Sequence, residues 1–169
     1  MKKDSVRNNC AAYLLLVLSV LCPSAHALLA SQASQAASTY SADATIPAVQ
    51  LLQPEELVQM LRSSGEKPLV LQVGSHVLYA EAHVPGSEYV GAAGTSTGLQ
   101  ALRERVSSLK KNQVIVLYCG CCPWGKCPNI RPAYQELKAL GFTQVKALYL
   151  ANNFGTDWVT KGYPVAKDN

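Results

Sequence analysis

The residues best suited to chemistry are four cysteines gathered within nine positions of the sequence. They are Cys119, Cys121, Cys122 and Cys127. A thiolate is a strong nucleophile, a redox partner and a metal ligand. A scaffold held by disulfides spreads its cysteines, because cross-links that close long loops constrain the unfolded chain most. This clustering therefore predicts a chemical site rather than a set of structural bridges.

Cys119 differs from the other three because it directly follows an apolar run, residues 113–118, that reads as a buried strand. A helix is predicted from Asn129 to Leu140, with Asn129 as its cap. Ligands of α/β folds gather at the carboxyl ends of strands, next to helix N-termini that stabilise anionic sulfur. We therefore expect Cys119 to be the nucleophile. The loop supplies candidate resolving thiols, with Cys122 and Cys127 favoured and Cys121 as a further choice.

The elements that must position this loop alternate along the chain. One helix is predicted to begin at Gln53, and two others are predicted at 99–110 and 129–140. Strands are predicted at 68–73, 113–118 and 145–150. The strand segments are nearly continuous apolar runs, as in strands covered on both faces. The order predicts an α/β fold with a mainly parallel central sheet flanked by helices.

Several ordered motifs resemble those of the rhodanese family of sulfurtransferases. Residues 79–87, with His83, resemble the family's aromatic residue and following Gly-His-Ile-Pro-Gly-Ala-like turn. Residues 153–158 and 162–165 are similar to its closing Gly-Gly, Trp and Gly-x-Pro-Val pattern, and residues 137–142 to the end of the helix after its active loop. The resemblance covers residues 46–168. Each motif is weak alone, but their order is specific.

The resemblance implies a three-layer rhodanese-like fold and a sulfurtransferase that passes sulfane sulfur through a persulfide on Cys119. It also implies a small sulfur donor, thiosulfate or another, and a thiol or cyanide-type acceptor, and no cofactor. If the loop cysteines form a disulfide, a partner redox protein is expected to reduce it. Residues expected to bind substrate are Gly120, Trp124, Gly125, Lys126 and Arg131, the last two because cations beside the site attract anionic sulfur compounds.

Two departures from the family pattern concern the site itself. The family's Asp-x-Arg after the first central strand is replaced by Gln72-Val73-Gly74, so its charge pair is absent. The active loop is also longer than the family's usual six residues and carries three additional cysteines.

The same cysteines allow two other functions. Cys119 and Cys122 form a C-x-x-C pair, which suits a dithiol/disulfide oxidoreductase on the same fold. A thioredoxin fold is disfavoured, since the His83 turn and the Trp158 ending are not expected there. Alternatively, the four thiolates would hold Cu(I) or Zn²⁺. The C-x-C-C-x4-C spacing differs from the paired C-x-x-C of structural zinc sites.

The first 27 residues have the three parts of a secretory signal. A basic start precedes the apolar run 11–21 and the small-x-small site that ends at Ala27. We expect cleavage after Ala27 and export, to the periplasm or the medium. Lipidation of Cys22 is the rival, disfavoured by the bulky Leu21 before it. The apolar run is too short for a membrane span. Residues 28–45 read as a flexible spacer and 46–169 as one domain.

The charge of the chain gives no reason to expect a polyanionic partner. The full sequence carries +4, but Lys2, Lys3, Arg7 and Asp4 fall in the predicted signal, which leaves 12 basic and 10 acidic residues, or +2. Neither this charge nor the short Lys110-Lys111 run favours nucleic acid or an anionic membrane as a partner.

Overall fold

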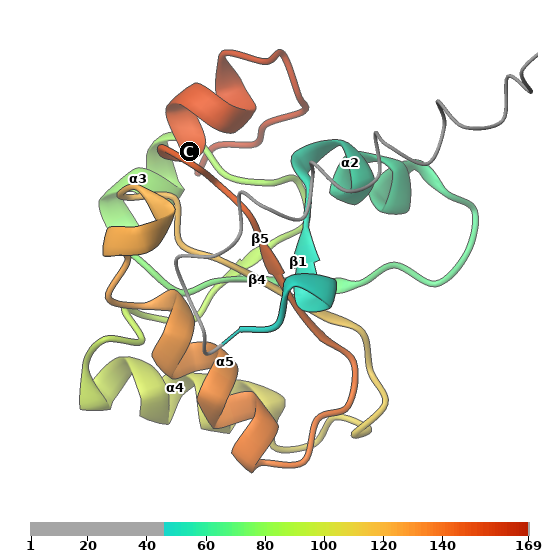
Figure 1. The fold of residues 1–169 in the computed structure, drawn as a ribbon, viewed down its shortest axis with the longest axis vertical. Helices are drawn as coiled ribbons and strands as arrows, with labels where there is room; N and C mark the ends of the chain where they lie inside the picture. The colour runs from blue at the N-terminus through green and yellow to red at the C-terminus, as the bar shows by residue number, and fades with distance from the viewer. Residues whose placement is uncertain (1–45, 169) are drawn as a thin grey trace, which may run out of the picture. The chain divides into compact units, whose positions relative to one another are not determined.

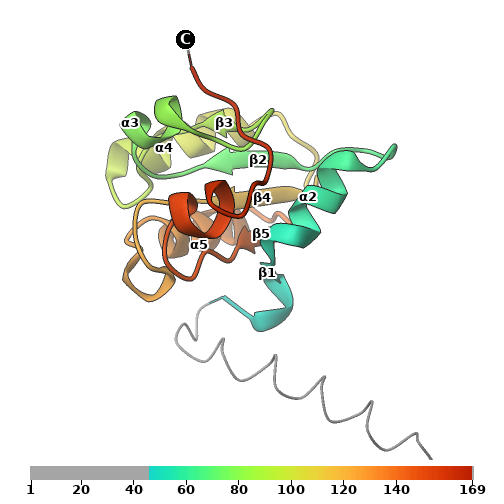
Figure 2. The same ribbon diagram turned by 90° about the horizontal axis from the view of Figure 1, so that it is seen from above.

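The computed structural model describes residues 46–168, so the predicted signal and spacer lie outside the described residues. Five parallel strands form one sheet in the order β1-β5-β4-β2-β3 (Figures 1 and 2). Their bounds are β1 Leu51–Leu52, β2 Leu69–Gln72, β3 Glu88–Tyr89, β4 Ile115–Tyr118 and β5 Val145–Leu148. Since β4 lies at the centre, the loop that follows it opens in the middle of the sheet's carboxyl edge.

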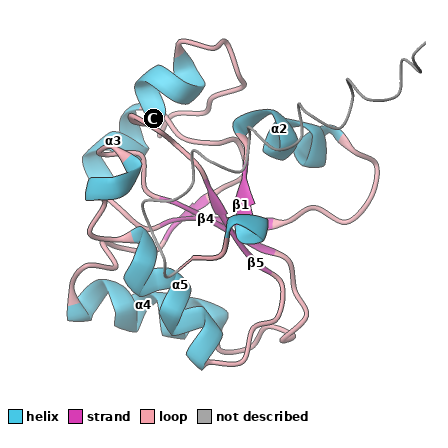
Figure 3. Cartoon of the chain, in the orientation of Figure 1, coloured by secondary structure: helices cyan, strands magenta, loops and turns pink. Residues whose placement is uncertain are grey.

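Helices cover both faces of this sheet (Figure 3). They are α2 Pro54–Arg62, α3 His76–Glu81, α4 Ser96–Val106 and α5 Ile130–Ala139, with short helical turns at Ala48–Gln50, Trp124–Lys126 and Gly155–Val159. Helices α4 and α5 pack together on one face, and α2 and the last helical turn pack on the other. The predicted three-layer α/β fold is confirmed.

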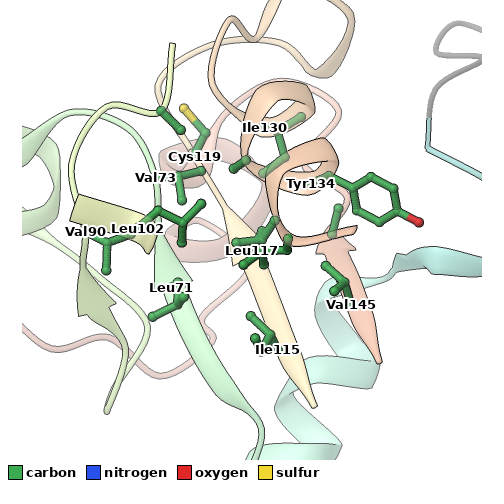
Figure 4. Close-up of a cluster of buried hydrophobic side chains, with 14 of the residues drawn as sticks. Leu71, Val73, Val90, Leu102, Ile115, Leu117, Cys119, Ile130, Tyr134 and Val145 are labelled. Atoms are coloured by element: carbon green, nitrogen blue, oxygen red, sulfur yellow. The ribbon is translucent and has the colours of Figure 1, made fainter. Parts of the chain in front are cut away.

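Strand β4 divides its side chains between the two layers. Ile115, Leu117 and Cys119 join the core beneath α4 and α5 (Figure 4). Val116 and Tyr118 face the opposite core, which includes Trp158. This alternation follows from the two-residue period of a strand, and it turns Cys119 toward α5.

Most predicted elements are present with shifted ends. Helix α4 begins at Ser96, earlier than expected, because the Thr95 hydroxyl caps it by accepting the Gly98 N–H. Asn129 is the N-cap residue of α5, as predicted, but its side chain makes no capping bond and contacts other segments instead. Strands β1 and β3 and helix α3 were not predicted.

The C-terminal segment closes the face opposite α4 and α5. Trp158 is fully buried, and its indole N–H donates to the Pro164 carbonyl at 2.8 Å. His83 is also buried; its Nδ1 lies 2.8 Å from the Tyr79 carbonyl, and its backbone pairs with Ala166. His83 thus fixes a turn. Within residues 46–168, no helix has the length and hydrophobicity needed to cross a membrane.

Candidate active site

Cys119 lies at the carboxyl end of β4 and is only 5% exposed. The Gln72 side chain holds its backbone, because Nε2 donates to the Cys119 carbonyl at 2.9 Å while Oε1 accepts the Gly74 N–H at 3.0 Å. A methyl group added at Gly74 would lie 2.6 Å from the Cys119 Sγ. The neutral pair Gln72 and Gly74, in place of a charged one, therefore forms a close-fitting wall behind the sulfur.

The four cysteines come together around this position. The Sγ atoms of Cys119 and Cys121 are 3.2 Å apart, and those of Cys121 and Cys122 are 3.3 Å apart. Cys127 hydrogen-bonds to Cys119 through its thiol. All four thiols are free, with Cys119 buried and Cys121 exposed. The grouping expected from the sequence is confirmed, and it forms a chain of thiols from the interior to the surface.

Asn129 supplies a polar contact that the sequence did not reveal. Its Nδ2 donates to the Cys119 Sγ at 3.3 Å, and its Oδ1 accepts the Gly94 N–H at 2.8 Å. The side chain is buried, with 6% exposed. A donor at this place stabilises negative charge on the sulfur of Cys119. The position of Asn129, shortly after the last loop cysteine, was a sequence signal for this contact. The same position is also typical of a helix N-cap, so the signal did not identify the contact.

The N-terminus of α5 acts on a different cysteine from the one expected. The backbone N–H groups of Asn129 and Ile130 donate to the thiol of Cys127, which favours anionic sulfur there. Three effects oppose them: the hydrogen bond with Cys119, burial, and the electrostatic interaction with Cys119. Together they raise the pKa of Cys127 far above its usual range. Cys127 therefore serves as a protonated donor to the sulfur of Cys119.

The two remaining loop thiols are also held in their protonated form. Burial is the main cause that raises the pKa of the Cys121 thiol and of the Cys122 thiol above the ordinary value. In each case a neighbouring thiol donates a hydrogen bond that partly offsets this effect. Both thiols therefore need an alkaline pH, or a base, before they become nucleophiles.

A cavity of about 270 Å³ opens beside Cys119, lined also by Gly120, Cys121, Leu78 and Phe154. Gly120 holds a positive φ of 79°, and a side chain there would collide with Phe154, so glycine lets the loop pass this wall. Among the residues expected to bind substrate, Gly120 lines this cavity.

Trp124 lines a second space of about 10 Å³ beneath the loop, next to Cys122 and Cys127. Its indole N–H is buried without a partner among residues 46–168. Gly125, Lys126 and Arg131 line neither space. Of the expected substrate residues, Gly120 and Trp124 thus line spaces that Cys119 also lines, Gly125 and Lys126 lie elsewhere on the loop, and Arg131 lies in α5.

The metal-binding alternative requires a different loop geometry. In the described part of the chain, no three His, Cys, Asp or Glu side chains are arranged to hold a metal ion. Cys119, Cys121, Cys122 and Cys127 would have to rearrange before they could serve as ligands together.

Comparisons with known proteins bear on this arrangement. A family model described as a rhodanese-like domain matches residues 53–150. Among solved structures, the BH2092 protein from Bacillus halodurans superposes with a TM-score of 0.55 at 20% identity, over 80% of this chain and 86% of that one. The Alr3790 protein from Anabaena sp. gives 0.54 at 20% identity, over 69% and 82%.

A thiosulfate sulfurtransferase from Pseudomonas aeruginosa is also similar, with a TM-score of 0.51 at 25% identity. The similarity covers 70% of this chain but 19% of that protein, so the chain spans about a fifth of its length. No curated protein matches the sequence. The structural matches at 20% identity bear on the fold alone.

Proposed function

Because this chain belongs to the rhodanese-like domain family, we propose that it is an exported sulfurtransferase that carries sulfane sulfur as a persulfide on Cys119. The observation that carries the proposal is the setting of the Cys119 sulfur. It lies at the end of the central strand, accepts a hydrogen bond from Asn129 Nδ2 at 3.3 Å and borders a cavity. Such a setting stabilises a thiolate and gives a donor access to it.

In the loading step, the Cys119 thiolate attacks the sulfane sulfur of the donor. A sulfur–sulfur bond forms at Cys119, and the bond between that sulfur and the rest of the donor breaks, with the electron pair leaving on the donor. In the unloading step, a thiol or cyanide-type acceptor attacks the outer sulfur, and the electron pair returns to Cys119. The Asn129 amide and the Cys127 thiol stabilise the anionic Cys119 before and after transfer.

The loop cysteines provide a second way to discharge the persulfide. A loop thiolate attacks the inner sulfur, which forms a disulfide with Cys119 and releases hydrosulfide. A partner protein with a reduced dithiol then restores both thiols, so the electrons balance. The 3.2 Å distance between the Cys119 and Cys121 sulfurs supports Cys121 as the first attacker, whereas the sequence favoured Cys122 or Cys127.

The same contact supports one alternative, a dithiol/disulfide oxidoreductase on this fold. In that case Cys119 and Cys121 exchange a disulfide with a partner dithiol, and no persulfide is needed. An exported protein meets oxidising conditions, in which such a pair persists as a disulfide.

Single serine variants of the four cysteines distinguish these functions. After incubation with a sulfane-sulfur donor, the intact mass of the reduced mature protein should rise by about 32 Da. Cys119→Ser should abolish this gain and the transfer to cyanide. Cys121→Ser should retain the gain but lose disulfide formation with release of hydrosulfide.

Loading that persists in Cys119→Ser contradicts the proposed nucleophile. If the wild-type protein gains no sulfur yet oxidises or reduces a test dithiol through Cys119, the oxidoreductase is the correct function. Stoichiometric metal retained by protein purified without reductant, and lost in the serine variants, would identify the metal-binding alternative.

A further inference from the structure

The cavity beside Cys119 has a largely apolar wall. Leu78, Ala82, Phe154 and Val159 line it. Leu78 and Val159 are each 40% exposed. They present apolar surface to whatever enters, so the cavity favours a compound with a hydrocarbon part.

One charged side chain lines this cavity in the described part of the chain, and it is negative. Glu81 lies at the end of α3, is exposed, and makes no ion pair within residues 46–168. No lysine or arginine of these residues lines the wall. The nearest expected cations in sequence, Lys126 and Arg131, are not part of it. The local charge is therefore opposite in sign to the net charge of the domain.

Two uncharged polar side chains of the wall, those of Gln72 and Tyr118, are already hydrogen-bonded within the protein. The Gln72 amide bonds to the backbone at Gly74 and Cys119. The Tyr118 hydroxyl lies 3.0 Å from the Ser87 Oγ and accepts the Val84 N–H. A doubly charged oxyanion such as thiosulfate would lose water here without gaining the charge of a lysine or arginine side chain.

We infer that the cavity takes the exchanging compound as an organic thiol or persulfide with no negative charge apart from its reacting sulfur, and that Glu81 favours one that carries a cationic group. This inference rests on the proposed function and specifies its substrate class. The acceptor thiolate attacks the outer sulfur of the Cys119 persulfide. A new sulfur–sulfur bond forms, the bond to Cys119 breaks, and its electron pair stays on Cys119, so no outside oxidant or reductant is required.

Three thiols that differ only at one end test this inference. They are cysteamine, 2-mercaptoethanol and 2-mercaptoethanesulfonate, which are cationic, neutral and anionic. The protein is first loaded on Cys119, and the loading is checked by the gain of about 32 Da. Second-order rate constants for loss of that sulfur are then measured at low ionic strength. The quantity of interest is the ratio of the cysteamine rate to the sulfonate rate, compared between wild type and variants, because intrinsic thiol reactivity cancels in that comparison.

Glu81→Gln should lower this ratio by roughly threefold and Glu81→Lys by roughly tenfold, with 0.5 M salt removing most of the difference. The 2-mercaptoethanol rate should change little. Glu66→Lys is the matched control, because Glu66 is exposed and does not line the cavity, and it should leave the ratio as in wild type.

A ratio unchanged in Glu81→Lys, in protein that loads sulfur normally, overturns the inference and leaves the proposed function intact. Equal shifts in Glu81→Lys and Glu66→Lys also overturn it, because they would report net charge alone. If wild-type protein never gains the persulfide sulfur, both the proposed function and this inference are wrong.

Discussion

The Cys119 sulfur has little freedom on the side of Gly74, where any added carbon would lie 2.6 Å from it and 3.0 Å from the Cys119 carbonyl oxygen. Gly74→Ala should therefore displace the sulfur and lower stability by about 1 to 3 kcal/mol, as overpacking does. Urea unfolding and the rate of sulfur loading measure the two effects. Gly65→Ala is the control, since its methyl group would meet nothing within 4 Å. Normal loading in Gly74→Ala would show that the sulfur can move freely.

The Asn129 side chain bonds both to the Gly94 backbone and to the Cys119 sulfur. A substitution of the same size can remove the second hydrogen bond while it keeps the first. Asn129→Asp keeps the oxygen that accepts the Gly94 N–H but replaces the donor to Cys119 by a second, negatively charged oxygen. Anionic sulfur is then disfavoured, so loading should slow by about tenfold or more at pH 7. Peptide mass mapping of Cys119 alkylation gives an independent rate. A variant that loads and alkylates as fast as wild type would contradict this role for the amide.

The loop thiols predict a distinctive pH dependence of the resolving step. Because burial raises the pKa of Cys121 and of Cys122, both are almost entirely protonated at pH 7. The thiolate fraction, and with it the rate of disulfide formation after loading, should rise about tenfold for each pH unit from 7 to 9. Quenching loaded protein with an alkylating reagent at timed intervals measures this rate. A plateau below pH 8 would mean that neither thiol is the attacker.

Among the elements, α4 depends on a close approach to the preceding turn. A methyl group at Gly98 would lie far inside van der Waals contact distance of the Ala92 carbonyl oxygen, which belongs to the backbone and cannot rotate away. Gly98→Ala should cost about 3 kcal/mol of unfolding free energy. Gly65→Ala should cost less than about 1 kcal/mol. Equal urea unfolding midpoints for Gly98→Ala and wild type would show that α4 can shift along the sheet without a loss of stability.

The elements predicted from the sequence were those with a local pattern of their own, such as the continuous apolar run of β4. Strands β1 and β3 contain two residues each, too few for a period, and exist because a neighbouring strand pairs with them. The cysteine cluster was equally visible, since its members are close in sequence. The contact from Asn129 to Gly94 spans 35 positions, and no local pattern reports such a pairing.

For the molecule as a whole, one prediction rests on the sequence alone, namely that the first 27 residues are a secretory signal. In a host that exports it, the protein should begin at Leu28, because Ala25 and Ala27 offer the small side chains that cleavage requires. N-terminal sequencing of the exported protein checks this. Ala27→Leu should block cleavage and leave the precursor mass. Wild-type protein that keeps Met1 would contradict the signal, and a lipid-sized mass gain at Cys22 would identify an anchor instead.

Strands β1 and β5 are neighbours in the sheet although they come from opposite ends of the described chain. While the chain is still being synthesised, β1 has no partner and β4 has one free edge until residues 145–148 have emerged. Pairing between such distant segments is slow and comes late in folding. A nascent chain therefore stays open for nearly the whole time that it is being made, which is the state in which a polypeptide can be threaded through a narrow pore.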